Sequence, residues 1–310
     1  MLLELKNVHK SFGAKHVLRG IGFRAESGQA LGLLGRNGAG KTTTIRIIAN
    51  IFMQDSGEVI FSDGDKKIDR PNVRIGYMPE ERGLYPKKKI IDQMVYLGEL
   101  RGMTARAAAK RAEALLGELE ATEYINSKLE TLSKGNQQKI QLAIALINEP
   151  DVVILDEPFS GLDPVNSMLL KKMIDGYTML GKTVLFSSHQ MSYVEEFCRH
   201  VCIINNGEIV LDGNLQEIKR SYPRNRIYVV PDKNKSRDSL IKILKDGGSE
   251  FITDVKPNKN GALATLKSEH DKGLLLRLLN DRGIHPDAFA VTEPSLEEIF
   301  VERAGGNEAV

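Results

Sequence analysis

The chain has 310 residues, of which 41% are hydrophobic and 27% are charged. This length suggests about two domains, and the composition is that of a globular protein with a substantial core. The 43 basic and 41 acidic residues nearly cancel, so the sequence predicts no extended basic surface for binding nucleic acid. With only two cysteines, a disulfide framework is excluded and a reducing compartment is favoured.

The amino-terminal segment carries Glu4, Lys6 and Lys10, so it lacks the continuous apolar stretch of a signal peptide. No run approaches the roughly 18–20 apolar residues that a membrane-spanning helix needs. We therefore expect any role at a membrane to depend on a partner protein.

Strand-like patterns recur through the first two thirds of the chain. Residues 2–8 and 17–25 alternate as in an antiparallel sheet. Short, continuous apolar runs, typical of strands buried on both faces of a parallel sheet, lie at 30–34, 152–155 and 184–186.

Helical patterns separate these runs. After Lys41, the residues Ile45, Ile48 and Phe52 recur at helical spacing, and residues 104–119 are rich in helix-forming side chains. The alternation of strands and helices predicts an α/β fold with a mainly parallel sheet.

The hydrophobic pattern changes near residues 222–224, which predicts one domain over residues 1–222 and a smaller one over 223–310. In the second we expect strands at 226–230, 251–256, 262–267 and 288–291, helices at 236–244 and 272–281, and a final helix at 296–302. This βαββαβ order matches the α+β, ferredoxin-like pattern.

The two cysteines, Cys198 and Cys202, flank His200. Two thiols and one imidazole fall short of the four ligands of a structural zinc site, and no second cluster lies nearby in the sequence. We expect both cysteines to be structural residues beside a buried strand.

Residues 35–42, Gly-Arg-Asn-Gly-Ala-Gly-Lys-Thr, follow the apolar run at 30–34 and open a predicted helix, the context of a Walker A loop. Glycines let backbone N–H groups turn toward phosphate oxygens, and the helix amino terminus favours an anion. Lys41 can reach the β- and γ-phosphates, and the Thr42 hydroxyl can ligate Mg²⁺. The residues predicted to bind nucleotide here are Gly35, Arg36, Asn37, Gly38, Ala39, Gly40, Lys41, Thr42 and Thr43.

The apolar run at 152–155 ends in two carboxylates, Asp156 and Glu157. Asp156 suits the magnesium shell, and Glu157 is placed to orient or deprotonate the attacking water. No Asn-Lys-x-Asp motif for reading guanine is present, which weakens a GTPase interpretation.

From about residue 2 to residue 220, the order and spacing of motifs closely resemble the ATP-binding cassette (ABC) family. Leu-Ser-Lys-Gly-Asn-Gln-Gln at 132–138 is similar to the family signature, and Ser-Gly-Leu-Asp-Pro at 160–164 to the loop after Walker B. Phe12 matches the aromatic residue that stacks on adenine, and His189 the switch histidine. The resemblance implies a P-loop ATPase fold with a helical subdomain at about 88–148, ATP and Mg²⁺ as cofactors, and catalytic roles for His189 and Glu157.

In this family two cassettes close head to tail around two nucleotides, so the signature of one subunit meets the γ-phosphate held by the other. The resemblance therefore implies contacts with the partner's nucleotide for Ser133, Gly135, Asn136 and Asp163. Ser133 is expected to cap a helix that starts at Lys134.

Three positions depart from the family pattern. Lys134 and Asn136 replace the usual glycine and glutamine of the signature, and Glu80 replaces the usual glutamine after the strand predicted at 74–78. Because a carboxylate can still ligate magnesium or water, Glu80 joins Thr42 and Asp156 as a predicted metal ligand.

Residues 76–86 and the Pro-Ser-Leu-Glu-Glu-Ile-Phe segment at 294–300 resemble the sodium- and drug-efflux branch of the family. This resemblance implies an exporter subunit, cytoplasmic and peripheral at the inner face of the membrane. Its implied partners are a second cassette, identical or paralogous, and a separate multi-span permease. We expect the permease contact at residues 80–89 with the helical subdomain behind them, 90–119. In the loop, Leu84, Tyr85 and Pro86 offer an apolar edge beside three lysines.

Two alternatives remain open. The first is a soluble cassette ATPase that acts on ribosomes or chromosomes. Relatives that act in translation carry two cassettes in one chain, whereas this chain has a single Walker A, and relatives that act on chromosomes insert long coiled coils, whereas no sustained heptads occur here. The other alternative, a different P-loop nucleotide enzyme such as a small-molecule kinase, is disfavoured by the signature.

Overall fold

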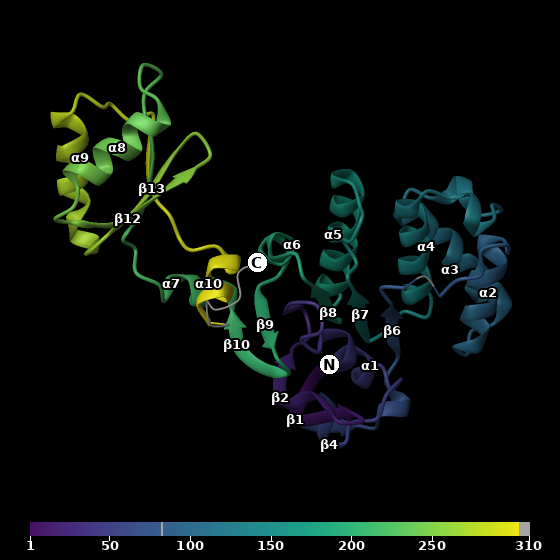
Figure 1. Cartoon of the computed structure of the whole chain (residues 1–310). Coiled ribbons are helices and arrows are strands. Elements are labelled where there is room, and N and C mark those ends of the chain that lie inside the picture. Colours follow the sequence, from purple (N-terminus) through teal and green to yellow (C-terminus); the bar gives the residue numbers. More distant parts are fainter. Residues whose placement is uncertain (82, 304–310) are drawn as a thin grey trace. The chain divides into compact units, whose positions relative to one another are not determined.

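The computed structural model describes residues 1–81 and 83–303. The described residues form two compact units, one containing Met1–Leu215 and residues 300–303, the other containing Gln216–Ile299 (Figure 1). The boundary expected from the sequence, between residues 222 and 223, stays a prediction.

The first unit is built around a mixed sheet with the strand order β10-β9-β3-β8-β7-β6. Its strands are β3 (Ala30–Leu34), β6 (Ile75–Met78), β7 (Val152–Asp156), β8 (Thr183–Ser188), β9 (His200–Asn205) and β10 (Glu208–Asn214). The neighbouring strands pair in parallel except β9 and β10. The apolar runs β3, β7 and β8 are buried along their whole length, which confirms the predicted α/β fold.

An antiparallel sheet with the order β2-β1-β4-β5 packs against this core. Its strands are β1 (Leu2–Phe12), β2 (Lys15–Ala25), β4 (Ser56–Asp63) and β5 (Lys66–Ile68). β1 and β2 run beyond their predicted ends to a tight hairpin, at which Phe12 pairs with Lys15. The hairpin thus sets these two side chains next to each other.

Helix α1 (Lys41–Ile48) follows the phosphate loop and is shorter than the sequence pattern suggests. Asn50 adopts a left-handed backbone with φ of 62°, so the chain turns out of the helix before Phe52. The prediction that Phe52 continues this helix is therefore wrong, although Phe52 still packs against the core.

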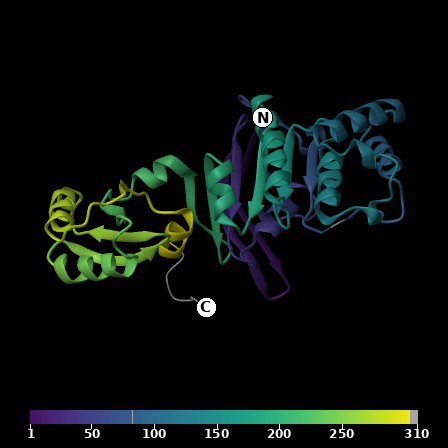
Figure 2. The ribbon, with the colours of Figure 1, turned by 90° about the horizontal axis from the view of Figure 1, so that it is seen from above.

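Three helices, α2 (Ile90–Leu100), α3 (Ala105–Glu118) and α4 (Lys134–Leu146), gather at the β6 edge of the mixed sheet (Figure 1). Figure 2, turned by 90°, shows them at the same edge. Thr104 caps α3 by accepting a hydrogen bond from Ala107 N at 3.2 Å, which confirms the helix predicted there. The unit also contains α5 (Pro164–Met179) and α6 (Met191–Phe197), and α7 (Leu215–Arg220) follows β10.

The second unit contains a sheet with the order β12-β13-β11-β14, paired antiparallel throughout. Its elements are β11 (Arg226–Val230), α8 (Arg237–Gly247), β12 (Ile252–Asn258), β13 (Gly261–Leu266), α9 (Lys272–Asp281) and β14 (Ala288–Val291), followed by α10 (Leu296–Arg303). Leucines of α8 and α9 share one core with alternate residues of β11 and β13. This is the element order predicted from the sequence.

The sequence predicts no membrane-spanning helix and a structural role for the two cysteines. Among the described residues, none of the helices is long and apolar enough to cross a membrane. Cys198 and Cys202 are both buried, and burial raises the pKa of each thiol well above its ordinary value. In the part of the chain that the structure describes, no group of three or more His, Cys, Asp and Glu side chains is placed to hold a metal ion by itself.

Candidate active site

The phosphate loop, residues 35–42, connects β3 to α1. Gly40 precedes α1 with φ of 117° and provides no side-chain cap, so the first amides of the helix are left for a ligand. A Cβ at Gly35 would stand 2.4 Å from the Ile204 carbonyl oxygen of β9, so only glycine lets the loop pack there. A Cβ at Gly38, by contrast, would meet open space. The loop is thus packed beneath and open above, as a phosphate cradle requires.

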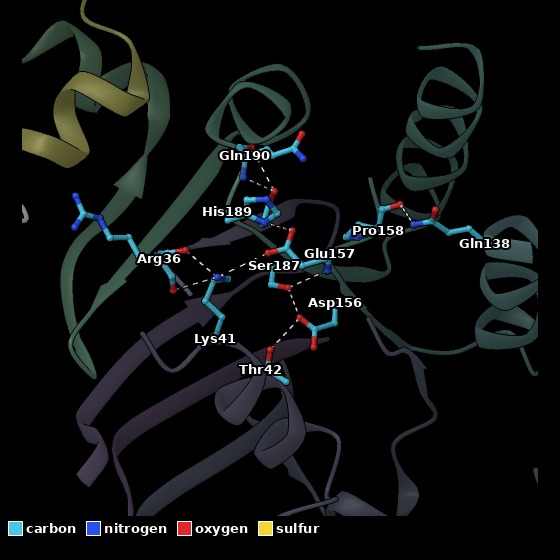
Figure 3. Close-up of polar contacts among 12 residues, drawn as sticks. Arg36, Lys41, Thr42, Gln138, Asp156, Glu157, Pro158, Ser187, His189 and Gln190 are labelled. Carbon is cyan, nitrogen blue, oxygen red and sulfur yellow. Dashed lines mark hydrogen bonds and ion pairs between the residues drawn. The ribbon is translucent and has the colours of Figure 1, made fainter. Parts of the chain in front are cut away.

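Lys41 lies buried inside this loop. Its Nζ donates to the Gly35 carbonyl oxygen at 2.8 Å and to that of Arg36 at 3.4 Å, and it lies 3.7 Å from Glu157 Oε1 (Figure 3). Burial lowers the pKa of Lys41, and the charges of Glu157 and Asp156 oppose that shift. The Arg36 side chain points away from Lys41. A bound phosphate group could replace these carbonyl oxygens as the hydrogen-bond acceptor of the Lys41 ammonium.

Asp156 ends β7, and Glu157 follows with a left-handed backbone, φ of 50°. Ser187, in register with Asp156 on the neighbouring strand β8, bridges the two. Its hydroxyl donates to Asp156 Oδ1 and accepts the Glu157 main-chain N–H at 3.1 Å. One hydroxyl thereby orients both the Asp156 carboxylate and the turn that carries Glu157 (Figure 3).

The Glu157 carboxylate is only 6% exposed and its two oxygens differ. His189 Nδ1 lies 2.9 Å from Oε2. Oε1 is buried without a hydrogen-bond partner among the described residues. Since buried polar atoms are normally hydrogen-bonded, this oxygen can accept a proton or hydrogen bond from a water molecule. His189 is in position to hold the carboxylate in that orientation.

A second buried oxygen without a hydrogen-bond partner bears on whether a magnesium ion fits the site. Asp156 Oδ2 is buried without a partner among the described residues, and Thr42 Oγ1 lies 3.5 Å from Asp156 Oδ1. Hydroxyl and carboxylate oxygens are the ligands that Mg²⁺ prefers beside phosphate. Glu80 and Thr42 both line the pocket that opens above the phosphate loop. Thr42 and Asp156 therefore fit a magnesium ion, which when bound would neutralise charge on the phosphates, and the assignment of Glu80 as a further ligand stays a prediction.

A pocket of about 450 Å³ opens above the loop. Its lining includes the predicted residues Phe12, Asn37, Gly38, Gly40, Thr43 and Glu80, together with Lys41, Thr42 and Glu157. Ala39 is buried below the loop, where its carbonyl oxygen accepts the Gly207 N–H at 3.1 Å. Residues predicted from widely separated motifs thus meet around one cavity.

The signature residues form a second group. Ser133 caps α4 by accepting a hydrogen bond from Asn136 N at 3.3 Å, as predicted. Asp163 caps α5 by accepting one from Asn166 N at 2.8 Å, and Gly135 lies against the Asn166 side chain. Among the described residues, Ser133, Gly135, Asn136 and Asp163 do not line the pocket of their own chain. One chain therefore contains the phosphate loop with its pocket and, separate from that pocket, the capped starts of α4 and α5.

The segment after β6 connects the pocket to the helices at the sheet edge. Gln141 of α4 donates to the carbonyl oxygens of Pro79 at 2.6 Å and Glu81 at 3.2 Å, on either side of Glu80. Gln93 of α2 accepts the Tyr85 N–H at 2.8 Å. Position 82 of the predicted contact loop lies outside the described residues.

Sequence reasoning missed several of these residues. Ser187 precedes the switch histidine, but its bridging role depends on the pairing of two strands that are distant in sequence. Gln141 and Gln93 belong to no recognised motif, and the burial of their polar side chains is the only feature that singles them out. Lys15 and Val17, at the start of β2, line the pocket although neither belongs to a recognised motif.

Comparison with known proteins agrees with this geometry. The family model described as ABC transporter matches residues 18–160, and the model of the DrrA1-3-like ATP-binding protein C-terminal domain matches residues 213–304. The chain is 40% identical to the uncharacterized ABC transporter ATP-binding protein YhaQ of Bacillus subtilis, over 98% of this chain and 99% of that protein. It is 29% identical to the linearmycin resistance ATP-binding protein LnrL of the same species, over 98% of both.

Solved structures show the same cassette. The ATP-binding subunit of an ABC transporter aligns with a TM-score of 0.64 and 29% identity, covering 71% of this chain and 93% of that one. MJ0796, a cassette solved as a dimer with ADP and Pi in a post-hydrolysis state, aligns with a TM-score of 0.60 and 25% identity, covering 69% and 98%. The chain therefore belongs to the family of ABC transporter ATP-binding proteins and is an ATPase that binds and hydrolyses ATP.

Proposed function

We propose that this ATPase drives export through a separate membrane permease, on the cytoplasmic face of the membrane. The observation that carries the proposal is the connection from pocket to surface: Glu80 lines the nucleotide pocket, and the same loop carries Tyr85, which is 55% exposed. The names of similar proteins support export: one is a resistance protein, and another is a Nod factor export protein 33% identical over 68% of this chain. The cargo class, sodium, drugs or similar molecules, rests on the sequence resemblance alone.

In the proposed reaction, Glu157 is the general base and His189 orients it through the Nδ1–Oε2 contact. Lys41 and the loop amides bind the β- and γ-phosphates, Phe12 stacks on the adenine, and Mg²⁺ is held by Thr42 and Asp156 with Glu80 nearby. Buried donors of this kind stabilise the charge that develops on the transferring phosphoryl group.

We infer that two cassettes act together, head to tail. The supporting observation is that Ser133 and Asp163, at the capped starts of α4 and α5, are not among the described residues that line the chain's own pocket. Helix amino termini favour anions, so a partner's γ-phosphate is a suitable ligand for the start of α4, where the Ser133 cap is uncharged. Lys134, exposed beside Ser133, adds a positive charge to that surface.

The accessory unit we infer to be ferredoxin-like, on the support of its β12-β13-β11-β14 order and the two helices that share one core.

The experiment targets the loop at 80–89. Leu84→Asp combined with Tyr85→Asp places two charges on the proposed permease contact, while Gln93 still holds the loop through the Tyr85 main chain. We expect basal ATPase of the isolated chain to stay within about 2-fold, because neither side chain lines the pocket. Association with the permease, or its stimulation of ATPase, should be lost, because each buried charge costs several kcal/mol at an interface.

A matched control carries the same charges elsewhere in the unit. Met179 and Leu180, 87% and 73% exposed at the end of α5, offer an apolar pair for Met179→Asp with Leu180→Asp. The control should assemble with the permease normally. Normal assembly and transport by the Leu84/Tyr85 variant would exclude this loop as the coupling site.

A further inference from the structure

The nucleotide pocket is lined by two lysines, although the motifs account for one. Lys41 lies within the phosphate loop, whereas Lys15 comes from the start of β2. No family motif includes Lys15, and the pocket alone brings it near the loop. Its place in the fold therefore decides whether it can serve the nucleotide.

The packing of β2 places Lys15 at the pocket. Lys15 and Val17 both line it, and Val17 lies at an irregularity in the β1–β2 pairing, between His16 opposite Ser11 and Leu18 opposite Lys10. The strand lies tightly against the phosphate loop, since a Cβ at Gly40 would stand 2.6 Å from Leu18 Cδ2 and 3.4 Å from the Val17 carbonyl oxygen. Lys15 therefore extends from a strand packed on the cradle.

The hairpin also places Lys15 directly across from Phe12. The Phe12 ring meets Phe52 edge-on at 5.4 Å between centroids, and Lys10 Nζ lies 5.4 Å from the Phe12 centroid. Lys10 is committed elsewhere, because its ammonium pairs with Asp55 at 2.7 Å. Among the described residues, no carboxylate forms an ion pair with Lys15.

The charges of the site call for a further cation. Lys41 faces Glu157 at 3.7 Å, and Asp156 and Glu80 also act on it. These three carboxylates outweigh the single positive charge of Lys41 before a polyphosphate anion arrives. A magnesium ion would serve the phosphates next to Thr42. The end of the pocket near Phe12 has Lys15 as its available cation.

We propose that Lys15 binds the α-phosphate of the nucleotide, the phosphate next to the ribose. The proposal rests on the roles assigned above to Phe12 at the base and Lys41 at the β- and γ-phosphates, because the α-phosphate lies between them. The pairing with Phe12 across the hairpin starts the Lys15 side chain next to Phe12, and its long aliphatic stem lets the ammonium extend toward the anion. Lys15 is thus a substrate-binding residue of the ATPase that its sequence motifs do not reveal.

The test measures equilibrium binding of ATP, AMP and adenosine to the full chain at low salt, with Lys15→Ala, Lys15→Arg and the control Lys66→Ala. Lys66 is an exposed lysine of the antiparallel sheet that does not line the pocket. We expect Lys15→Ala to weaken ATP and AMP binding about 3- to 10-fold, the effect of one partly exposed charge contact. Adenosine binding should not change, Lys15→Arg should stay near wild type, and added salt should shrink the loss.

Two results would overturn the proposal: ATP binding by Lys15→Ala equal to that of Lys66→Ala, or an equal loss for adenosine, which would assign Lys15 to the base instead. Lys41→Ala tests the site assignment separately. If Lys41→Ala binds ATP like the wild type, the phosphate positions are wrong regardless of Lys15. The measurements need no permease, so failure of the export proposal leaves them unaffected.

Discussion

Replacing Glu157 with glutamine tests the proposed general base most directly. The side chain is 6% exposed, keeps its size in Glu157→Gln, and lies 2.9 Å from His189 Nδ1 and 3.7 Å from Lys41 Nζ. The amide cannot take a proton from water at Oε1, so hydrolysis should fall by roughly 10²–10⁴-fold. That loss corresponds to roughly 3–5 kcal/mol of activation free energy.

Binding should respond in the opposite way. Glu157→Gln removes a negative charge beside Lys41, and the loop that binds phosphate does not depend on the carboxylate for its main-chain contacts. We expect ATP affinity to be kept or increased, and the ATP-bound variant to accumulate as a dimer. The assay pairs phosphate release with equilibrium ATP binding on one preparation, followed by size-exclusion chromatography with ATP.

Glu58→Gln, at an exposed position on β4, is the matched control and should hydrolyse ATP normally. Wild-type turnover in Glu157→Gln would refute the assignment of the base. Loss of ATP binding along with turnover would show instead that the carboxylate supports the cradle itself.

Two further predictions concern residues that only the structure identifies. Ser187→Ala removes the bridge between Asp156 and the Glu157 main chain, so kcat should fall about 10-fold and the magnesium requirement should rise, with little change in ATP-binding affinity. Ser187→Thr keeps a hydroxyl and should recover much of the activity. A kcat of Ser187→Ala equal to that of the wild type in steady-state assays would refute the bridge. In the accessory unit, Arg226 holds the pKa of Glu298 at about 2, below its usual 4.5, so the pair stabilises the fold above pH 4.5 and is lost as pH falls toward 2. Because Glu298 is 45% exposed, Glu298→Gln should lower the free energy of unfolding at pH 7 by only about 1 kcal/mol and flatten its decline from pH 4.5 to 2 in denaturant titrations.

The local sequence pattern was sufficient to predict much of the fold and of the phosphate-binding loop. The cradle at 35–42 was predictable because glycine spacing, an apolar strand before it and a helix after it are all local properties. The same holds for the Ser133 cap, confirmed at Asn136 N, and for the βαββαβ order of the accessory unit. In each case the residues that decide the structure are close in sequence.

The helix end at Ile48 was missed although the signal was local. The period of Ile45, Ile48 and Phe52 favoured a longer helix, and the left-handed Asn50 ended it instead. Hydrophobic spacing describes which face is buried, and Phe52 is indeed packed on the core without being helical.

The remaining features depended on which strands become neighbours. β8 follows β7 in the chain after a long helix, and only their parallel register puts Ser187 opposite Asp156. Lys15 lines the pocket because β2 packs against the phosphate loop, and Gln141 reaches Pro79 because α4 lies at the β6 edge. The sequence by itself determined the groups that carry the chemistry, since their spacing is local; tertiary structure decided the residues that orient them, because long-range packing sets those contacts and no local period encodes it.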